Sequence, residues 1–127
     1  MLKTKHLLPL LLLPLLLAGC ASTVTNLTTR QLPRNPSGLY PVEARWDSNQ
    51  QSLRRDSIKA YVVVGLESYP MQRTQLTVNR WEAVVPVPKS QRFLNYRFKF
   101  DYLYNAVPAP RADSKLSAPL ELEIVDK

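Results

Sequence analysis

Residues 94–102 alternate strictly between apolar and polar side chains, and this repeat of two constrains the fold more than any other feature of the chain. Every even-numbered position from Leu94 to Tyr102 is apolar or aromatic, and every odd-numbered position between them is polar or charged. Successive side chains of a β-strand point to opposite faces of a sheet. The pattern therefore predicts a strand with one buried face and one solvated face.

Other stretches of the chain also indicate strands. Leu39–Trp46 and Leu120–Val125 alternate in the same way, and the β-branched run within Ile58–Leu66 predicts a strand buried on both sides. Two further segments, Thr74–Val78 and Trp81–Val87, predict a hairpin with its turn near Asn79.

From residue 20 onward the chain contains no clear amphipathic helix, and residues 48–57 could form at most a helical turn or a polar loop. About seven short strands separated by Pro-rich turns favour an all-β fold, namely an immunoglobulin-like antiparallel β-sandwich. We expect the core to include four aromatic residues: Trp81, Tyr96, Phe98 and Phe100.

The first 19 residues have the composition of an export signal. Lys3 and Lys5 precede Leu7–Leu17, in which every residue is Leu except Pro9 and Pro14. A membrane-spanning helix needs about 20 apolar residues, and this run is about half that length. It therefore predicts an N-terminal signal helix that is cleaved and not kept as an anchor.

The apolar run ends in Leu17-Ala18-Gly19-Cys20, which resembles the lipobox of bacterial lipoproteins. The resemblance implies that the Cys20 thiol receives a diacylglyceryl group, that the chain is cut between Gly19 and Cys20, and that the new amino terminus is acylated, for example with palmitate. Two or three acyl chains hold a protein on a membrane far more firmly than one. The other interpretation is a plain signal peptide with a Cys at its cleavage site by chance.

The lipobox divides the chain into a lipoprotein signal peptide over 1–19, a lipidated N-terminus and polar tether over 20–38, and a β-sandwich domain over 39–127. Ala21 and Ser22 follow the Cys, whereas Asp at the first of these positions favours inner-membrane retention in lipoproteins of Gram-negative bacteria. The resemblance therefore implies a lipid-anchored protein of the outer membrane that faces the periplasm or the cell surface.

The residue types left after processing exclude several kinds of chemistry. The only His, His6, lies in the leader, and Cys20 is the only Cys. Ser-His-Asp and Cys-His catalysis and His/Cys metal sites are therefore excluded, and we expect no enzyme, no metal and no cofactor. A two-carboxylate glycosidase stays formally open, although no acidic pair stands out. Glu121 and Glu123 share the outer face of one predicted strand, which indicates a solvated surface.

The formal net charge of +7 includes Lys3 and Lys5 of the leader, so the processed chain keeps a moderate positive charge. Its basic residues could form a patch for phosphate-bearing or polyanionic partners, although their spread along the sequence is typical of ordinary surface charge. The candidates are Arg54, Arg55, Arg73, Arg80, Arg92, Arg97 and Lys99. We expect no nucleic-acid partner, because the leader directs export.

Three segments together resemble the glycogen-binding module of the E-set group of immunoglobulin-like proteins. They are Val64–Met71, with its Val-Gly and Pro-Met pairs, Arg80–Pro88, with a Trp and a Pro turn, and Tyr96–Asp101. The family has Tyr-Lys-Phe followed by Asp-Gly in the last of these, whereas this chain has Tyr-Arg-Phe and places Tyr102 after the Asp.

Carried over residue by residue, Tyr69 and Tyr104 stand where that family has its two sugar-stacking Trp residues, and Arg97 stands where it has a Lys. The resemblance implies that the two aromatic rings would stack on sugar rings while Arg97 would donate hydrogen bonds to their hydroxyl groups. Such a site requires Tyr69 and Tyr104 to be exposed on one face.

We therefore expect a membrane-anchored, non-catalytic envelope lipoprotein, held by acyl chains on Cys20, whose β-sandwich has a binding, docking or structural role. Its partner would be another envelope protein or assembly, bound through strand edges or Tyr-bearing loops. The alternative is a lipid-tethered glycan-binding module that uses Tyr69, Arg97 and Tyr104. A third hypothesis, a small hydrolase, lacks a visible reactive group of residues.

Overall fold

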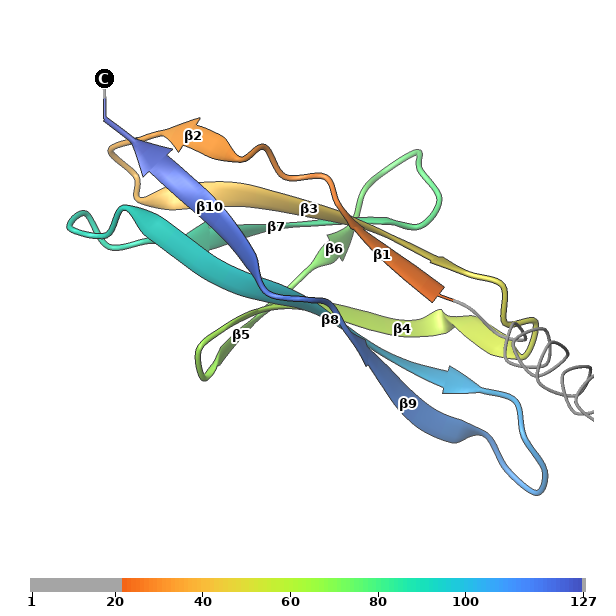
Figure 1. Cartoon of the computed structure of the whole chain (residues 1–127). Helices are drawn as coiled ribbons and strands as arrows, with labels where there is room; N and C mark the ends of the chain where they lie inside the picture. The colour runs from red at the N-terminus through yellow and green to blue at the C-terminus, as the bar shows by residue number, and fades with distance from the viewer. Residues whose placement is uncertain (1–21, 127) are drawn as a thin grey trace, which may run out of the picture.

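The computed structural model describes residues 22–126, which form two β-sheets packed face to face (Figure 1). The first sheet has four strands in the order β1-β3-β7-β6, and every pair in it is antiparallel. Their bounds are Ser22–Asn26 for β1, Leu39–Ser48 for β3, Arg80–Pro86 for β7 and Gln72–Arg73 for β6.

The second sheet has six strands in the order β2-β10-β8-β4-β5, with β9 also paired to β8. All pairs are antiparallel except β2 with β10, which is parallel. The bounds are Gln31–Pro33 for β2, Leu120–Val125 for β10, Phe93–Tyr104 for β8, Leu53–Val64 for β4, Glu67–Pro70 for β5 and Arg111–Leu116 for β9.

β9 and β10 together act as one strand interrupted by a bulge. Both lie on the side of β8 away from β4, with Leu116 opposite Lys99 and Leu120 opposite Tyr96. The β9–β10 side therefore contains one residue more than β8 over this stretch, which defines a β-bulge.

The strand order is that of an immunoglobulin-like sandwich. β1, β3, β7 and β6 occupy the places of strands A, B, E and D, while β5, β4, β8 and β10 occupy those of C′, C, F and G. The predicted all-β, immunoglobulin-like fold is thus confirmed. The described residues contain ten strands where about seven were expected, because short edge strands and the bulge add to the count.

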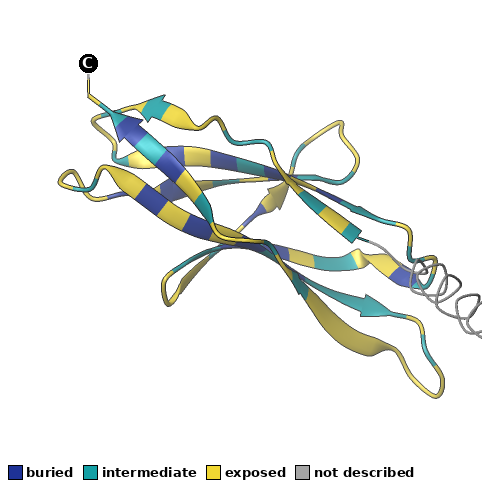
Figure 2. Cartoon of the chain, viewed as in Figure 1, coloured by how far each residue is buried: buried dark blue, intermediate teal, exposed yellow. Residues whose placement is uncertain are grey.

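The core lies between the two sheets and is built from alternate residues of each strand. Figure 2 shows buried and exposed residues alternating along β3 and β8. All four aromatic residues that we expected in the core are buried: Trp81, Tyr96, Phe98 and Phe100.

All buried hydrophobic residues of the described chain lie between Tyr40 and Ile124. Both sheets and the whole core are therefore contained in residues 22–126, so a chain that begins at Ala21 holds every strand of the described fold.

The predicted tether over 20–38 is wrong from Ser22 onward. β1 pairs with Ala44–Ser48 of β3, and β2 pairs with Glu123–Val125 of β10. Both strands are mostly polar because each lies at a sheet edge and directs only one apolar side chain to the core, Val24 or Leu32. Backbone hydrogen bonds hold this segment in the sandwich. Because such bonds do not depend on the side chains, the amino-acid composition of the segment does not reveal them.

The strand predicted over Ile58–Leu66 begins earlier, at Leu53, so the expected helical turn or polar loop over 48–57 is mostly strand. The prediction that both faces of this strand are buried is also wrong. Val62 is fully buried, whereas Val63 is only half-buried, because no strand of residues 22–126 forms a third layer over the outer face of β4.

The hairpin near Asn79 forms, but with a different first arm. Gln72–Arg73 pairs with β7, while Thr74–Val78 forms the loop between them. Asn79 adopts a φ of 67°, in the left-handed region that Asn tolerates better than most residues. The predicted turn position is therefore confirmed, and the strand assignment of Thr74–Val78 is wrong.

Candidate functional site

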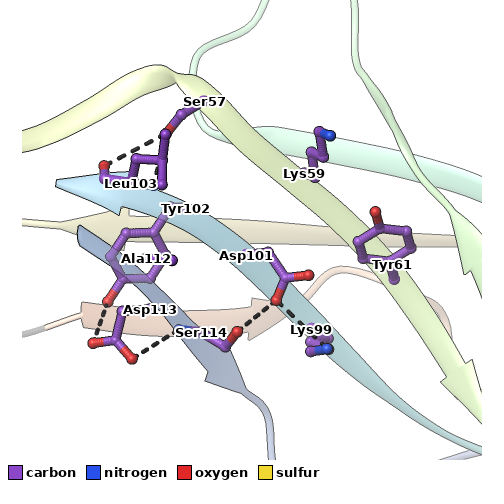
Figure 3. Close-up of a pocket in the computed structure, with 10 residues that line it drawn as sticks. All are labelled: Ser57, Lys59, Tyr61, Lys99, Asp101, Tyr102, Leu103, Ala112, Asp113 and Ser114. Atoms are coloured by element: carbon purple, nitrogen blue, oxygen red, sulfur yellow. Dashed lines mark hydrogen bonds and ion pairs between the residues drawn. The ribbon is translucent and has the colours of Figure 1, made fainter. Parts of the chain in front are cut away.

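An open groove lies on the outer face of β4, β8 and β9 and has a volume of about 650 Å³ (Figure 3). The side chains at the bottom of the groove point outward because successive side chains of a strand alternate between the two faces of the sheet. Lys59 and Tyr61 of β4 point outward because Ala60 and Val62 between and beyond them point to the core. The other lining residues are Ser57, Lys99, Asp101, Tyr102, Leu103, Ala112, Asp113 and Ser114.

Cross-strand pairing sets the order of charges across the groove. Lys59 lies opposite Asp101, and Tyr61 lies opposite Lys99. Opposite charges that face each other across two strands attract, so this register is electrostatically favourable. The groove thus presents two amines, a carboxylate and an aromatic ring on one sheet face.

The Asp101 carboxylate is held by its neighbours. Ser114 Oγ donates a hydrogen bond of 2.6 Å to Asp101 Oδ1, and Lys99 Nζ lies 3.6 Å from the same oxygen. Lys59, in contrast, makes no ion pair of 4.0 Å or less within residues 22–126. Its amine is available to a ligand or partner with an acidic group.

A second polar pair, between Tyr102 and Asp113, lies across the same strands β8 and β9 on the inner side of the sheet, where the Tyr102 ring packs beside Trp46. The phenol of Tyr102 donates to Asp113 Oδ2 at 3.3 Å. Burial, together with the negative charge of Asp113 and this hydrogen bond, raises the pKa of Tyr102 above its ordinary value. Tyr102 therefore stays protonated at neutral pH and donates to the carboxylate.

The hydroxyl groups near the groove have structural partners. Ser57 Oγ donates to the Arg54 carbonyl at 2.5 Å and accepts from the Leu103 N–H at 2.8 Å. Within residues 22–126 there is no group of three or more His, Cys, Asp or Glu side chains arranged to hold a metal. What the groove offers is charge and hydrogen-bonding complementarity, which suits recognition of a polar surface.

Sequence reasoning did not single out Lys59, Tyr61 and Asp101. The alternation in β4 and β8 would have placed these side chains outward, but β9, which closes the groove, was not predicted. One of its faces carries Arg111, Asp113 and Lys115, and the other carries Ala112, Ser114 and Leu116, so the strand has too weak a hydrophobic period to reveal it.

The three residues proposed for glycan binding do not come together. Tyr69 lies opposite Val62 and packs half-buried against the core. On its other side, Val62 lies opposite Phe98 of β8. Tyr104 is six residues farther along β8, which places it roughly 20 Å from Phe98.

Arg97 is exposed and lies on the outer face of β8, because its neighbour Phe98 points into the core. Tyr69 shares the inner side of the sheet with Val62. The three side chains therefore do not form the single exposed surface that sugar stacking requires.

The seven basic candidates also fail to form one patch. Three of them are paired with carboxylates at 3.4, 2.9 and 3.6 Å: Arg80 with Glu43, Arg92 with Glu123, and Lys99 with Asp101. Arg73 packs its guanidinium over Trp81, 4.3 Å from the ring centroid, and donates to the Arg55 carbonyl. The pairing of Glu123 also means that only Glu121 of the two strand-face acids is fully solvated.

The predicted lipidation and cleavage positions, Cys20 and Gly19, lie outside the described residues. β1 begins at Ser22, so Ala21 alone separates Cys20 from the first strand of the sandwich. In the part of the chain that the structure describes, no helix is long and apolar enough to span a membrane.

Comparisons with known proteins give one structural likeness. No protein-family model matches the chain, and no curated protein matches its sequence. A solved structure, that of murine CRIg, matches with a TM-score of 0.43 and 9% sequence identity, over 84% of this chain and 98% of that chain.

Proposed function

We propose that this protein is a lipid-anchored lipoprotein of the bacterial envelope whose immunoglobulin-like domain has a non-catalytic binding, docking or structural role. The observation that carries the proposal is Leu17-Ala18-Gly19-Cys20 at the end of an apolar run that is too short to span a bilayer. The start of β1 at Ser22 supports it, because a cut before Cys20 would leave the whole sandwich intact. The residues after Cys20 favour the outer membrane as its location.

The groove of Figure 3 is the surface that we assign to docking. Lys59 provides an amine that no carboxylate of the described residues pairs with, and Tyr61 provides an aromatic face beside it, so an acidic group on another envelope protein would complement this part of the groove. Glycan binding through Tyr69, Arg97 and Tyr104 is the weaker alternative, because the three side chains lie apart.

The anchor is tested by expressing the full precursor with a labelled palmitate analogue. We expect label on the wild-type protein, recovery in the membrane fraction, and a mature mass that begins at an acylated Cys20. Cys20→Ser should abolish all three. An unlabelled, soluble mature protein with an intact Cys20 would contradict the proposal.

The docking surface is tested by crosslinking in intact cells. A photoreactive amino acid at position 61, in place of Tyr, forms the crosslinks. We expect Lys59→Glu combined with Lys99→Glu in this protein to remove the crosslinked species. Lys89→Glu combined with Arg97→Glu changes the charge equally but lies outside the groove, so it should leave them unchanged. Equal crosslinking in both double variants would reject the groove as the docking surface.

A further inference from the structure

Three segments lie at the end of the sandwich from which the chain leads back to Cys20. Ser22 of β1 pairs with Ser48, which starts the β3–β4 turn, and Asn105 donates its backbone N–H to the Ser52 carbonyl. Asn79, at the end of the β6–β7 loop, accepts from the Trp46 N–H. Figure 1 shows the β3–β4 turn and the β8–β9 loop at the tip of this half of the molecule, and the β6–β7 loop projecting from its side. We call residues 45–56, 73–80 and 104–111 the N-terminal end.

The connection to Cys20 is short. A chain spans at most about 3.6 Å per residue, so the Cα atoms of Cys20 and Ser22 lie within about 7 Å of each other. If Cys20 carries the anchor, the N-terminal end cannot move away from the membrane surface without β1 leaving the sandwich.

Positive charge is concentrated at the N-terminal end. Within residues 22–126, this end contains six Arg and two Asp, while the rest contains eight basic and eight acidic residues. The excess charge of the described chain therefore lies entirely at this end. The six are Arg45, Arg54, Arg55, Arg73, Arg80 and Arg111.

Two of these arginines are free to bind an external anion. Arg54 and Arg111 are exposed and make no ion pair of 4.0 Å or less within residues 22–126. They lie on the two strands that flank β8, opposite Leu103 and Tyr104, at the base of the β8–β9 loop. A guanidinium group in this position is suited to a phosphate.

The loops of the N-terminal end also carry exposed apolar side chains. Val107 in the β8–β9 loop is 91% exposed, and Leu76 and Val78 in the β6–β7 loop are 106% and 76% exposed. No described residue covers them. Apolar side chains beside basic ones are the combination by which peripheral proteins enter a lipid interface.

We propose that the N-terminal end binds the surface of an anionic phospholipid membrane, with Arg54 and Arg111 on lipid phosphates and with Val107 and Leu76 inserted among the headgroups. This rests on the proposed anchor at Cys20, which holds this end at the bilayer. The groove on β4, β8 and β9 begins beside this end, where Leu103 lies opposite Arg54, and runs along β4 toward Tyr61.

The first experiment uses the mature lipoprotein reconstituted into vesicles of equal phosphatidylcholine and phosphatidylglycerol. Lipidation consumes the only thiol of the chain, so Leu76→Cys, Val107→Cys and Leu66→Cys each accept one environment-sensitive fluorophore. Leu66 is the matched control, because it is fully exposed but lies in the β4–β5 turn, at the opposite end of β4 and roughly 35 Å from Arg54.

We expect the labels at 76 and 107 to shift to shorter emission wavelength and to be quenched by brominated lipids, while the label at 66 stays aqueous. Three aqueous labels on a protein that floats with the vesicles would overturn the proposal and leave the anchor intact. A protein that does not float would instead contradict the anchor.

The second experiment uses a chain that begins at Ala21, which contains every strand of the sandwich but lacks Cys20, and so tests the surface independently of lipidation. We expect it to bind vesicles that contain phosphatidylglycerol more tightly than pure phosphatidylcholine vesicles, and to be released by salt. Arg54→Gln with Arg111→Gln should weaken this binding about thirtyfold. Lys89→Gln with Arg97→Gln, the charge-matched control, should change it by a much smaller factor. Equal losses in the two double variants would reject a specific membrane-binding end.

Discussion

Trp46 stacks on Phe100 across the interior of the sandwich, with ring centroids 5.1 Å apart and ring planes 19° apart. Trp46 comes from β3 of the first sheet and Phe100 from β8 of the second, so this contact joins the two layers. Trp81 of β7 meets the same Phe100 ring edge-on at 6.2 Å. Phe100 thus lies at the centre of the aromatic core.

Phe100→Ala should therefore reduce the free energy of unfolding by about 3–5 kcal/mol, because it leaves a cavity and removes both ring contacts. Urea unfolding followed by Trp fluorescence measures the change. Leu66→Ala, at a fully exposed site, should change stability by less than about 0.5 kcal/mol. Similar costs at both positions would show that the stacked pair does not join the sheets.

Ser117 supplies both hydrogen bonds of the Phe98 backbone at the bulge. Its N–H donates to the Phe98 carbonyl at 2.8 Å, and its hydroxyl accepts from the Phe98 N–H at 2.8 Å. Ser117→Ala should destabilise the protein by about 1–3 kcal/mol, because it leaves that N–H unpaired. The Phe98 amide should also exchange faster with deuterium. Ser90→Ala serves as the control, and an unchanged Phe98 exchange rate in Ser117→Ala would contradict the prediction.

Leu76 adopts a φ of 62° in the β6–β7 loop, a region that is unfavourable for residues with a side chain. Leu76→Gly should raise the free energy of unfolding by up to about 1 kcal/mol, since the strain removed exceeds the added entropy of the unfolded chain. Val78 has no positive φ, so Val78→Gly should lower stability instead. Thermal unfolding of both variants checks the opposite signs.

We expect the raised pKa of Tyr102 to make the free energy of unfolding depend on pH in the alkaline range. Burial and Asp113 raise its pKa in the folded state, so the folded state favours the neutral phenol. The resulting stabilisation is fully present below the unfolded pKa of about 10 and is lost as the pH rises through the higher folded pKa. Unfolding free energies from pH 8 to 11 should fall less steeply in Tyr102→Phe than in the wild type.

A spectroscopic titration isolates the same effect. The phenolate absorbance of Tyr102, obtained as the difference between wild type and Tyr102→Phe, should appear at lower pH in Asp113→Asn, because the neighbouring negative charge is gone. An unchanged midpoint would show that Asp113 does not contribute to the raised pKa.

The parts of the fold with a strong hydrophobic period were predictable. β8 and β10 alternate clearly, and their buried positions, such as Phe98 and Leu122, match the pattern. β1, β2 and β9 were not predicted as strands, since they lie at edges or outside the main path of the sheet and bury few side chains. Their stability comes from backbone hydrogen bonds to neighbours far away in the sequence.

The candidate functional sites also differ in whether the sequence alone could reveal them. The lipobox lies in consecutive residues, so Leu17 to Cys20 was recognisable from the chain alone, and it remains the basis of the proposed anchor. The groove depends on the register that sets Lys59 opposite Asp101, and Tyr69 and Tyr104 are separated by that same register.

By itself, therefore, the sequence determined the all-β class, the aromatic core and the position of the proposed lipidation site, because each follows from neighbouring residues or from the period of a single strand. Only the tertiary structure decided that residues 22–33 belong to the sandwich, that β9 closes a groove over β4 and β8, and that the excess of arginine lies at one end. Those features arise from pairing between distant segments, and cross-strand register, not local composition, brings their side chains together.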